Sequence, residues 1–243
     1  MRRVYVFLTL VGLVLAGPAI AEIRGKASVI SSAIISVNDV RMRLDGVDPP
    51  ESNQRCDLGN GMQWFCGRSA AAVLFLLVHE RDVTCHDRAP RSKDSAFKRV
   101  QCYVGGVDVS AEMIRRGMAW AASDAPADYK AAEGAAMAEA VGIFQADTER
   151  AQDYRQRSWR EAKGALNSDC PIKGNIDSLG RRFYHLPWSQ WYALTTIDTG
   201  RGERWFCNEA AARDAGWQRA QWNFVPRLAP EDMPKGGVLQ NQR

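Results

Sequence analysis

The sequence predicts a small β-barrel with helices attached to it, an α+β fold. Alternating apolar residues from Ala27 to Val37 and from Val40 to Val47, on either side of Asn38-Asp39, are typical of a β-hairpin. A helical pattern follows, then two more strand-like runs, then two more helical patterns. This order favours a barrel with appended helices, and a hydrophobic content of 46% is enough for a core.

The remaining elements of the barrel region follow from the spacing of apolar residues and from turn and capping signals. Helices are expected at Phe65 to Val78, Val109 to Ala121 and Asp128 to Ala146, and strands at Arg81 to Cys85 and Arg99 to Val104. Either Asp108 or Ser110 is suited to cap the second helix. The barrel region therefore carries three helices.

The chain changes character after this region. Residues 148–168 are rich in charged side chains and predict a linker that can form a helix. We expect its charges to face solvent; a basic strip that contacts phosphates is the alternative, and we assign no site to it. Residues 169–224 predict a small β unit with one helix capped by Asn208. Residues 225–243, with several Pro and a Gly pair, predict a disordered tail.

Four aromatic residues gather in the C-terminal unit: Trp188, Trp191, Tyr192 and Trp205. We interpret them as its core, since aromatic residues in a small unit are most often buried. The alternative is a surface on which a sugar or a base stacks.

The N-terminus predicts export. Arg2 and Arg3 precede an apolar run, and Ala19-Ile20-Ala21 resembles a cleavage site, so we interpret residues 1–21 as a signal peptide. The run is too short to span a bilayer and no later run is longer, so no membrane span is expected after cleavage. The expected destination is the periplasm or the cell exterior. Removing the signal peptide lowers the net charge from +4 to +2, too little to indicate nucleic acid as the partner by itself.

All six cysteines lie in the exported part, where disulfides persist. Local context favours the pairs Cys56 with Cys66, Cys85 with Cys102, and Cys170 with Cys207, although other pairings stay open. A metal site formed by Cys170, Cys207 and His185 is the alternative, but it offers only three ligands and lacks the paired spacing of structural zinc sites.

One block of sequence resembles a known family. Arg43-Leu44-Asp45-Gly46-Val47-Asp48-Pro49-Pro50-Glu51 is similar to the Arg-Leu-x-Gly-Ile-Asp-Ala-Pro-Glu block of thermonucleases, the staphylococcal nuclease-like proteins. Further segments of the family pattern are matched in the same order by Cys66-Gly67, Cys102 to Gly106, Met113 to Ala119 and Gly142-Ile143-Phe144. The resemblance covers roughly residues 24–147 and implies an OB-like five-stranded barrel, with the domain spanning 22–147. The C-terminal unit resembles a short module of some exported bacterial nuclease-like proteins.

The resemblance also implies a chemistry. The family uses calcium held by oxygen ligands, a carboxylate that activates water, and two arginines that neutralise charge on the phosphate. By resemblance, Asp48 is a metal ligand, Glu51 the general base and Arg43 a phosphate-binding guanidinium. A surface ion cluster at a strand end is the structural alternative.

Two positions depart from the family pattern. Ser31-Ser32-Ala33-Ile34 stands where family members carry Asp-Gly-Asp-Thr, so Ala33 replaces a metal-binding aspartate. An ungapped alignment, which we prefer, places Phe97 at the second arginine, whereas a shifted alignment retains Arg99. Loss of a carboxylate weakens a calcium site.

These observations predict a thermonuclease-like protein with a degraded catalytic centre that binds nucleic acid or another anionic polymer with little or no catalysis. An active calcium-dependent endonuclease cleaving DNA or RNA is the alternative. An accessory role in surface polysaccharide handling is a third, more distant hypothesis.

Overall fold

The computed structural model describes residues 22–88 and 97–220. The predicted signal peptide and the predicted tail at 225–243 lie outside the described residues. No helix within the described ranges is long and apolar enough to cross a membrane.

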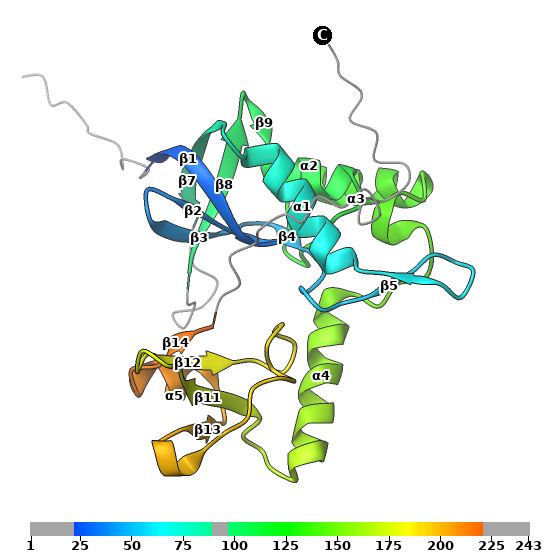
Figure 1. The fold of residues 1–243 in the computed structure, drawn as a ribbon. Coiled ribbons are helices and arrows are strands. Elements are labelled where there is room, and N and C mark those ends of the chain that lie inside the picture. The colour runs from blue at the N-terminus through cyan, green and yellow to red at the C-terminus, as the bar shows by residue number, and fades with distance from the viewer. Residues whose placement is uncertain (1–21, 89–96, 221–243) are drawn as a thin grey trace, which may run out of the picture.

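Five strands close into a barrel that carries the N-terminal half (Figure 1). They are β1 (Glu22–Ser31), β2 (Ile34–Val37), β3 (Val40–Leu44), β7 (Asp82–Arg88) and β8 (Lys98–Val104). The sheet order is β3-β2-β1-β7-β8, and a parallel pairing of β3 with β8 closes it. The short β9 (Val107–Asp108) extends β8 as a hairpin. The expected five-stranded, OB-like barrel is confirmed.

The first part of the expected hairpin differs from the prediction. A single strand was expected from Ala27 to Val37, but the chain reverses at Ser32 and Ala33, so that β1 and β2 pair with each other. The turn at Asn38-Asp39 is confirmed; both residues have positive φ, 50° and 62°, as a two-residue hairpin turn with the right-handed twist of its strands requires.

Three helices pack on the barrel: α1 (Cys66–Val78), α2 (Val109–Arg115) and α3 (Ala127–Ala138), followed by the 3₁₀ turn η1 (Gly142–Phe144). Asp108 caps α2 by accepting a hydrogen bond from the Ala111 amide at 3.1 Å. Two further strand pairs lie outside the barrel: β4 (Val47–Asp48) with β10 (Trp120–Ala121), and β5 (Cys56–Asp57) with β6 (Gln63–Trp64). The core combines inward residues of the strands with apolar faces of the helices.

The C-terminal module is a four-stranded sheet with one helix. Its elements are β11 (Ile172–Ile176), β12 (Arg182–His185), β13 (Arg204–Phe206) and β14 (Gln218–Arg219), with the 3₁₀ turn η2 (Thr199–Arg201) and α5 (Glu209–Asp214). Asn208 caps α5 as expected. The expected aromatic core is right only in part: Tyr184, Phe206 and Trp217 are its buried aromatic residues, Trp188 packs against them, and Trp191 is 43% exposed.

The segment 148–168 is the helix α4 (Ala151–Leu166), which runs from the barrel along the side of the module (Figure 1). Its first residue, Ala151, packs in a small cluster with Cys56, Cys66 and Trp120 beside the barrel. Further along, Trp159 packs against the core of the module. The helix is therefore anchored to both halves of the chain.

Three disulfides are present: Cys56–Cys66, Cys85–Cys102 and Cys170–Cys207. These are the pairs that local context favoured. The third joins residues 37 positions apart, and a loop of this length is worth about 4 kcal/mol in the chain-entropy model. Its sulfurs are bonded to each other, which removes the alternative of a metal site with His185.

Candidate functional site

The candidate site lies where β3 leaves the barrel. Arg43 is in β3, Asp48 ends β4, and Glu51 follows in a tight turn in which the Gln54 amide N–H is bonded to the Glu51 carbonyl. The start of α1 packs directly against this turn. A Cβ on Gly67 would lie 1.8 Å from the Glu51 carbonyl oxygen, so only glycine allows this approach.

Arg155, on α4, contacts both carboxylates of the site. Its Nη1 and Nη2 each donate to an Asp48 carboxylate oxygen at 2.9 Å, and Nη1 also donates to Glu51 Oε1 at 2.9 Å. All three side chains are largely buried, with exposed fractions between 20% and 24%. Burial acts to lower the pKa of Arg155, but the bonds to Asp48 and the charges of both carboxylates outweigh it and raise that pKa. The guanidinium is therefore a fixed cation between them.

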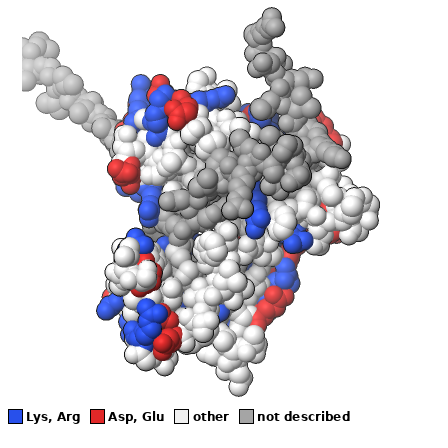
Figure 2. Space-filling model, in the orientation of Figure 1, with Lys and Arg blue, Asp and Glu red and all other residues white. Residues whose placement is uncertain are grey.

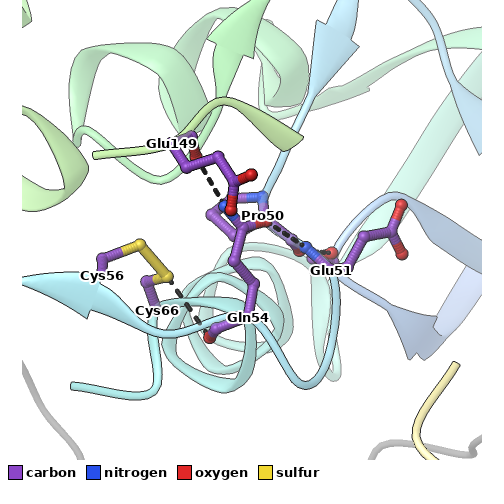
Figure 3. Close-up of a disulfide and its surroundings, with 7 residues drawn as sticks. Pro50, Glu51, Gln54, Cys56, Cys66 and Glu149 are labelled. Atoms are coloured by element: carbon purple, nitrogen blue, oxygen red, sulfur yellow. Dashed lines mark hydrogen bonds between the residues drawn. A yellow bond between two sulfur atoms is a disulfide. The ribbon is translucent and has the colours of Figure 1, made fainter. Parts of the chain in front are cut away.

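Gln54 connects the Glu51 turn to the start of α4 (Figure 3). It is 1% exposed; its Oε1 accepts from the Glu51 amide at 3.2 Å, and its Nε2 donates to the Glu149 carbonyl at 2.6 Å. Its own carbonyl oxygen lies 3.4 Å from Cys66 Sγ of the first disulfide. This buried amide fixes α4, and with it Arg155, relative to Glu51.

These residues do not fit a calcium ion. Calcium takes six to eight oxygen ligands, several of them carboxylates. Here Ala33 brings a methyl group, both Asp48 oxygens are engaged by a cation, and no group of three or more His, Cys, Asp or Glu residues within 22–88 and 97–220 is arranged to hold a metal. We therefore derive no catalytic step that passes through a metal.

The two candidate phosphate-binding arginines lie next to each other in register but face different carboxylates. Arg43 pairs with Arg99 across the parallel β3–β8 ladder. Arg43 Nη2 is 3.9 Å from Asp48 Oδ1, whereas Arg99 forms an ion pair with Asp45. Phe97 lies one residue before β8 begins. The structure thus brings Arg43, Asp48 and Glu51 together and directs Arg99 toward Asp45.

A cavity of about 70 Å³ lies between this site and the C-terminal module. From the barrel it is lined by Ile30, Ser31, Ser32, Ala33, Ile34, Arg43, Pro49, Glu51 and Ser52, and from the module by His185, Trp188, Ser189, Gln190, Trp191, Arg219 and Ala220. Ser32 fixes the wall at the β1–β2 turn by donating to the Pro50 carbonyl at 3.0 Å. Asn53 joins the two halves by donating to the carbonyls of Ser189 and Gln190.

His185 makes the module sensitive to acid. Burial, and secondarily the charge of Lys173, lowers the pKa of His185 from 6.5 to about 4. Between these values the unfolded chain binds a proton that the folded chain does not, so stability falls as the pH drops from 6.5 to 4. We expect a loss of about 2 to 3 kcal/mol over this window from His185, by linkage. Urea unfolding followed at several pH values measures it, and His185→Gln should remove most of this contribution; an unchanged slope would contradict the assignment.

Arg155 is the site residue that sequence reasoning missed. The charges of 148–168 were expected to face solvent, and for Arg155 this is wrong, because Asp48 and Glu51 offer a partly buried pair of carboxylates. Arg157 does match the expectation: it pairs with Glu149 and Glu161 on the exposed face of α4. A sequence signal for it exists: Ala151, Trp159 and Ala162 recur at helical spacing and place position 155 on the same face of the helix.

Comparison with known proteins finds a family match in the barrel region of the chain. A family model described as staphylococcal nuclease homologue matches residues 41–146. The succinoglycan biosynthesis protein ExoI of Rhizobium meliloti (strain 1021) is 30% identical over 134 residues, which cover 55% of this chain and 70% of that protein.

Proposed function

Since the chain belongs to the staphylococcal nuclease homologue family, we propose that it is an exported nuclease-like protein whose hydrolytic centre has been disabled and which binds an anionic polymer. Membership makes it nuclease-like and suggests nucleic acid as one class of ligand. The loss of hydrolysis, the export and the binding role are our proposals.

The guanidinium of Arg155 between Asp48 and Glu51 carries the proposal. A general base must accept a proton from water, yet Glu51 Oε1 already accepts a hydrogen bond from Arg155. A metal ligand must offer lone pairs to the ion, yet both Asp48 oxygens are engaged. With Ala33 in place of the family's metal-binding aspartate, the site holds an internal ion pair where hydrolysis needs carboxylates that are free to bind metal and water.

The arginines support a binding role. One missing charge-stabilising donor commonly lowers turnover by about 10²- to 10³-fold, so a site that keeps Arg43 but directs Arg99 to Asp45 is poorly suited to the transition state. Binding alone does not need the second arginine, because a single guanidinium that contacts a phosphate or carboxylate can bind the ligand without stabilising a transition state. Arg43 retains that capacity at the edge of the cavity.

Export is supported by the three disulfides, which form and persist in an oxidising compartment. The predicted signal peptide at 1–21 points the same way, toward the periplasm or the exterior. A role in surface polysaccharide handling is a second candidate, favoured by the name of the relative from Rhizobium meliloti.

The test is cleavage of single-stranded DNA by residues 22–243 with disulfides intact, with calcium or with chelator. We expect no calcium-dependent cleavage above that of Glu51→Gln, which has the same shape without the base. Fluorescence anisotropy of labelled polyanions should still show binding that weakens with salt. Calcium-dependent turnover that Glu51→Gln abolishes would show a working phosphodiesterase and overturn the proposal.

A further inference from the structure

We propose that the cavity between the barrel and the C-terminal module binds an acidic saccharide, a sugar unit that carries hydroxyl groups and an anionic group such as a carboxylate. The inference rests on the proposed polymer-binding function and names its ligand class and its site. It uses the module, to which the family resemblance assigns no activity.

Among residues 22–88 and 97–220, no hydrogen-bond partner is found for four buried polar atoms in one short segment: His185 Nδ1, Trp188 Nε1, Ser189 Oγ and Gln190 Oε1. All four residues line the cavity. Buried polar atoms nearly always have a partner, so such a cluster on one wall indicates a missing one. A polar ligand in the cavity is within reach of all four residues.

The types of these atoms specify the ligand. His185 Nε2 lies 2.8 Å from Asn175 Oδ1, and since an amide oxygen accepts, Nε2 carries the proton and Nδ1 is an acceptor. Gln190 Oε1 is a second acceptor, the Trp188 indole N–H is a donor, and the Ser189 hydroxyl is both. Two neutral acceptors beside two donors match a group of hydroxyls, which donate and accept together.

Two guanidinium groups provide the charge. Arg43 and Arg219 both line the cavity, and within the described ranges neither guanidinium donates a hydrogen bond. Their nearest carboxylate oxygens, on Asp48 and Glu209, are each 3.9 Å away. Asp48 is already bonded through both oxygens to Arg155, so an anion between Arg43 and Arg219 gains charge-assisted hydrogen bonds that the protein itself does not supply.

The cavity wall is held in place before any ligand arrives. Lys173 Nζ donates to the carbonyls of Tyr192 and Thr195, at 2.9 and 2.7 Å, and the Tyr192 hydroxyl donates to the Pro171 carbonyl at 2.6 Å. With Asn53 bonded to the carbonyls of Ser189 and Gln190, these contacts fix the loop after β12. A preformed wall lowers the entropy that binding must overcome.

Tryptophan side chains extend the site in a way that suits a chain of sugars. Trp188 also lines a second, open cavity of about 410 Å³, together with Trp159, Arg155 and Arg160 on α4. The rings of Trp159 and Trp188 are 6.1 Å apart. The cavity of about 70 Å³ has room for an anionic group and a neighbouring hydroxyl, while the adjoining open cavity can hold the sugar rings, whose apolar faces pack on the indoles.

The charge distribution disfavours nucleic acid at this place. A phosphate backbone offers acceptors only and is bound through several cations, whereas this cavity offers two guanidiniums beside two neutral acceptors and the Glu51 carboxylate. On the face shown in Figure 2, Lys and Arg lie among Asp and Glu and form no continuous basic surface. One negative charge per sugar unit fits this site better.

The test uses tetragalacturonate as the probe, its methyl ester as the uncharged match, and an oligothymidylate of about eight nucleotides. Calorimetry and tryptophan fluorescence of the disulfide-intact chain should show that tetragalacturonate binds, and that its methyl ester and the oligothymidylate bind much more weakly or not at all. Arg219→Gln should weaken it about 10-fold or more, and Arg182→Gln, on an exposed position of β12, should not. Ser189→Ala should weaken it about 3- to 10-fold without lowering Tm, because the hydroxyl has no partner in the part of the chain that the structure describes.

Three other outcomes would contradict the inference in part or in full. Equal binding of acid and ester would overturn the requirement for an anion. Binding of oligothymidylate alone, weakened by Arg219→Gln, would make the cavity a nucleic-acid site and overturn the saccharide inference while the proposed function stands. If neither polyanion binds at low salt, the proposed binding function fails, and the inference fails with it.

Discussion

Replacing Ala33 by Asp and Arg155 by Ala together is expected to create a calcium site, which we propose the natural chain lacks. Ala33 lies in the β1–β2 turn, and its carbonyl accepts from the Leu44 amide at 2.9 Å, which places it beside the strand that carries Arg43. A carboxylate here would supplement Asp48 and Glu51. Removal of Arg155 takes away a fixed cation that a divalent ion would have to approach at short range.

The expected dissociation constant of the double variant is about 10⁻³ M or tighter, the range of weak extracellular calcium modules. Calorimetry with calcium measures it, and Tm should rise with calcium because only the folded chain binds. The single variant A33D should bind far more weakly, since Arg155 still occupies Asp48 and Glu51. Saturable calcium binding by the natural chain, or by A33D alone to the same extent, would show that Arg155 does not block the site.

The barrel could be predicted because its signals are local. The tight turn at Asn38-Asp39, the apolar spacing of α1 and the block from Arg43 to Glu51 each depend on residues that are neighbours in the chain. The prediction went wrong at Ser32 and Ala33, where apolar alternation continues through a reversal. Neither Gly nor Pro marks that turn, so the pattern alone gives one long strand.

Arg155 could not be predicted because its partners are distant in the chain. It contacts Asp48 and Glu51 across 107 and 104 residues. The buried residues Ala151 and Ala162 recur at helical spacing and place Arg155 on the inward face of α4, but no pattern within the helix shows which groups that face meets. Whether an arginine is buried depends on whether the fold places carboxylates next to it.

The module shows the same limit. Trp188, Trp191, Tyr192 and Trp205 were expected to form its core, yet the buried aromatic residues are Tyr184, Phe206 and Trp217. Trp188 packs against that core and also lines the cavity. Composition identifies aromatic residues but not which face of a sheet each one occupies. In strands as short as β13 and β14, a shift of one residue exchanges the two faces.

Arg155→Met is expected to lower the free energy of unfolding by about 2 to 3 kcal/mol, because it leaves two largely buried carboxylates without their cation. Methionine keeps most of the packing volume, so the loss reports on charge. Arg157→Met is the matched control on the same helix; its pairs with Glu149 and Glu161 are exposed, and the expected change is within about 0.5 kcal/mol.

A double-mutant cycle of Arg155→Met with Asp48→Asn separates the ion pair from other effects of each substitution. We expect a coupling energy of about 1.5 kcal/mol or more, since two hydrogen bonds join these side chains. Strong coupling would mean that α4 is fixed over the carboxylates and that the family's catalytic position has become part of the structural framework. Coupling near zero, with Arg155→Met as mild as Arg157→Met, would mean that α4 can leave the site, and the carboxylates would then be open to water and to cations.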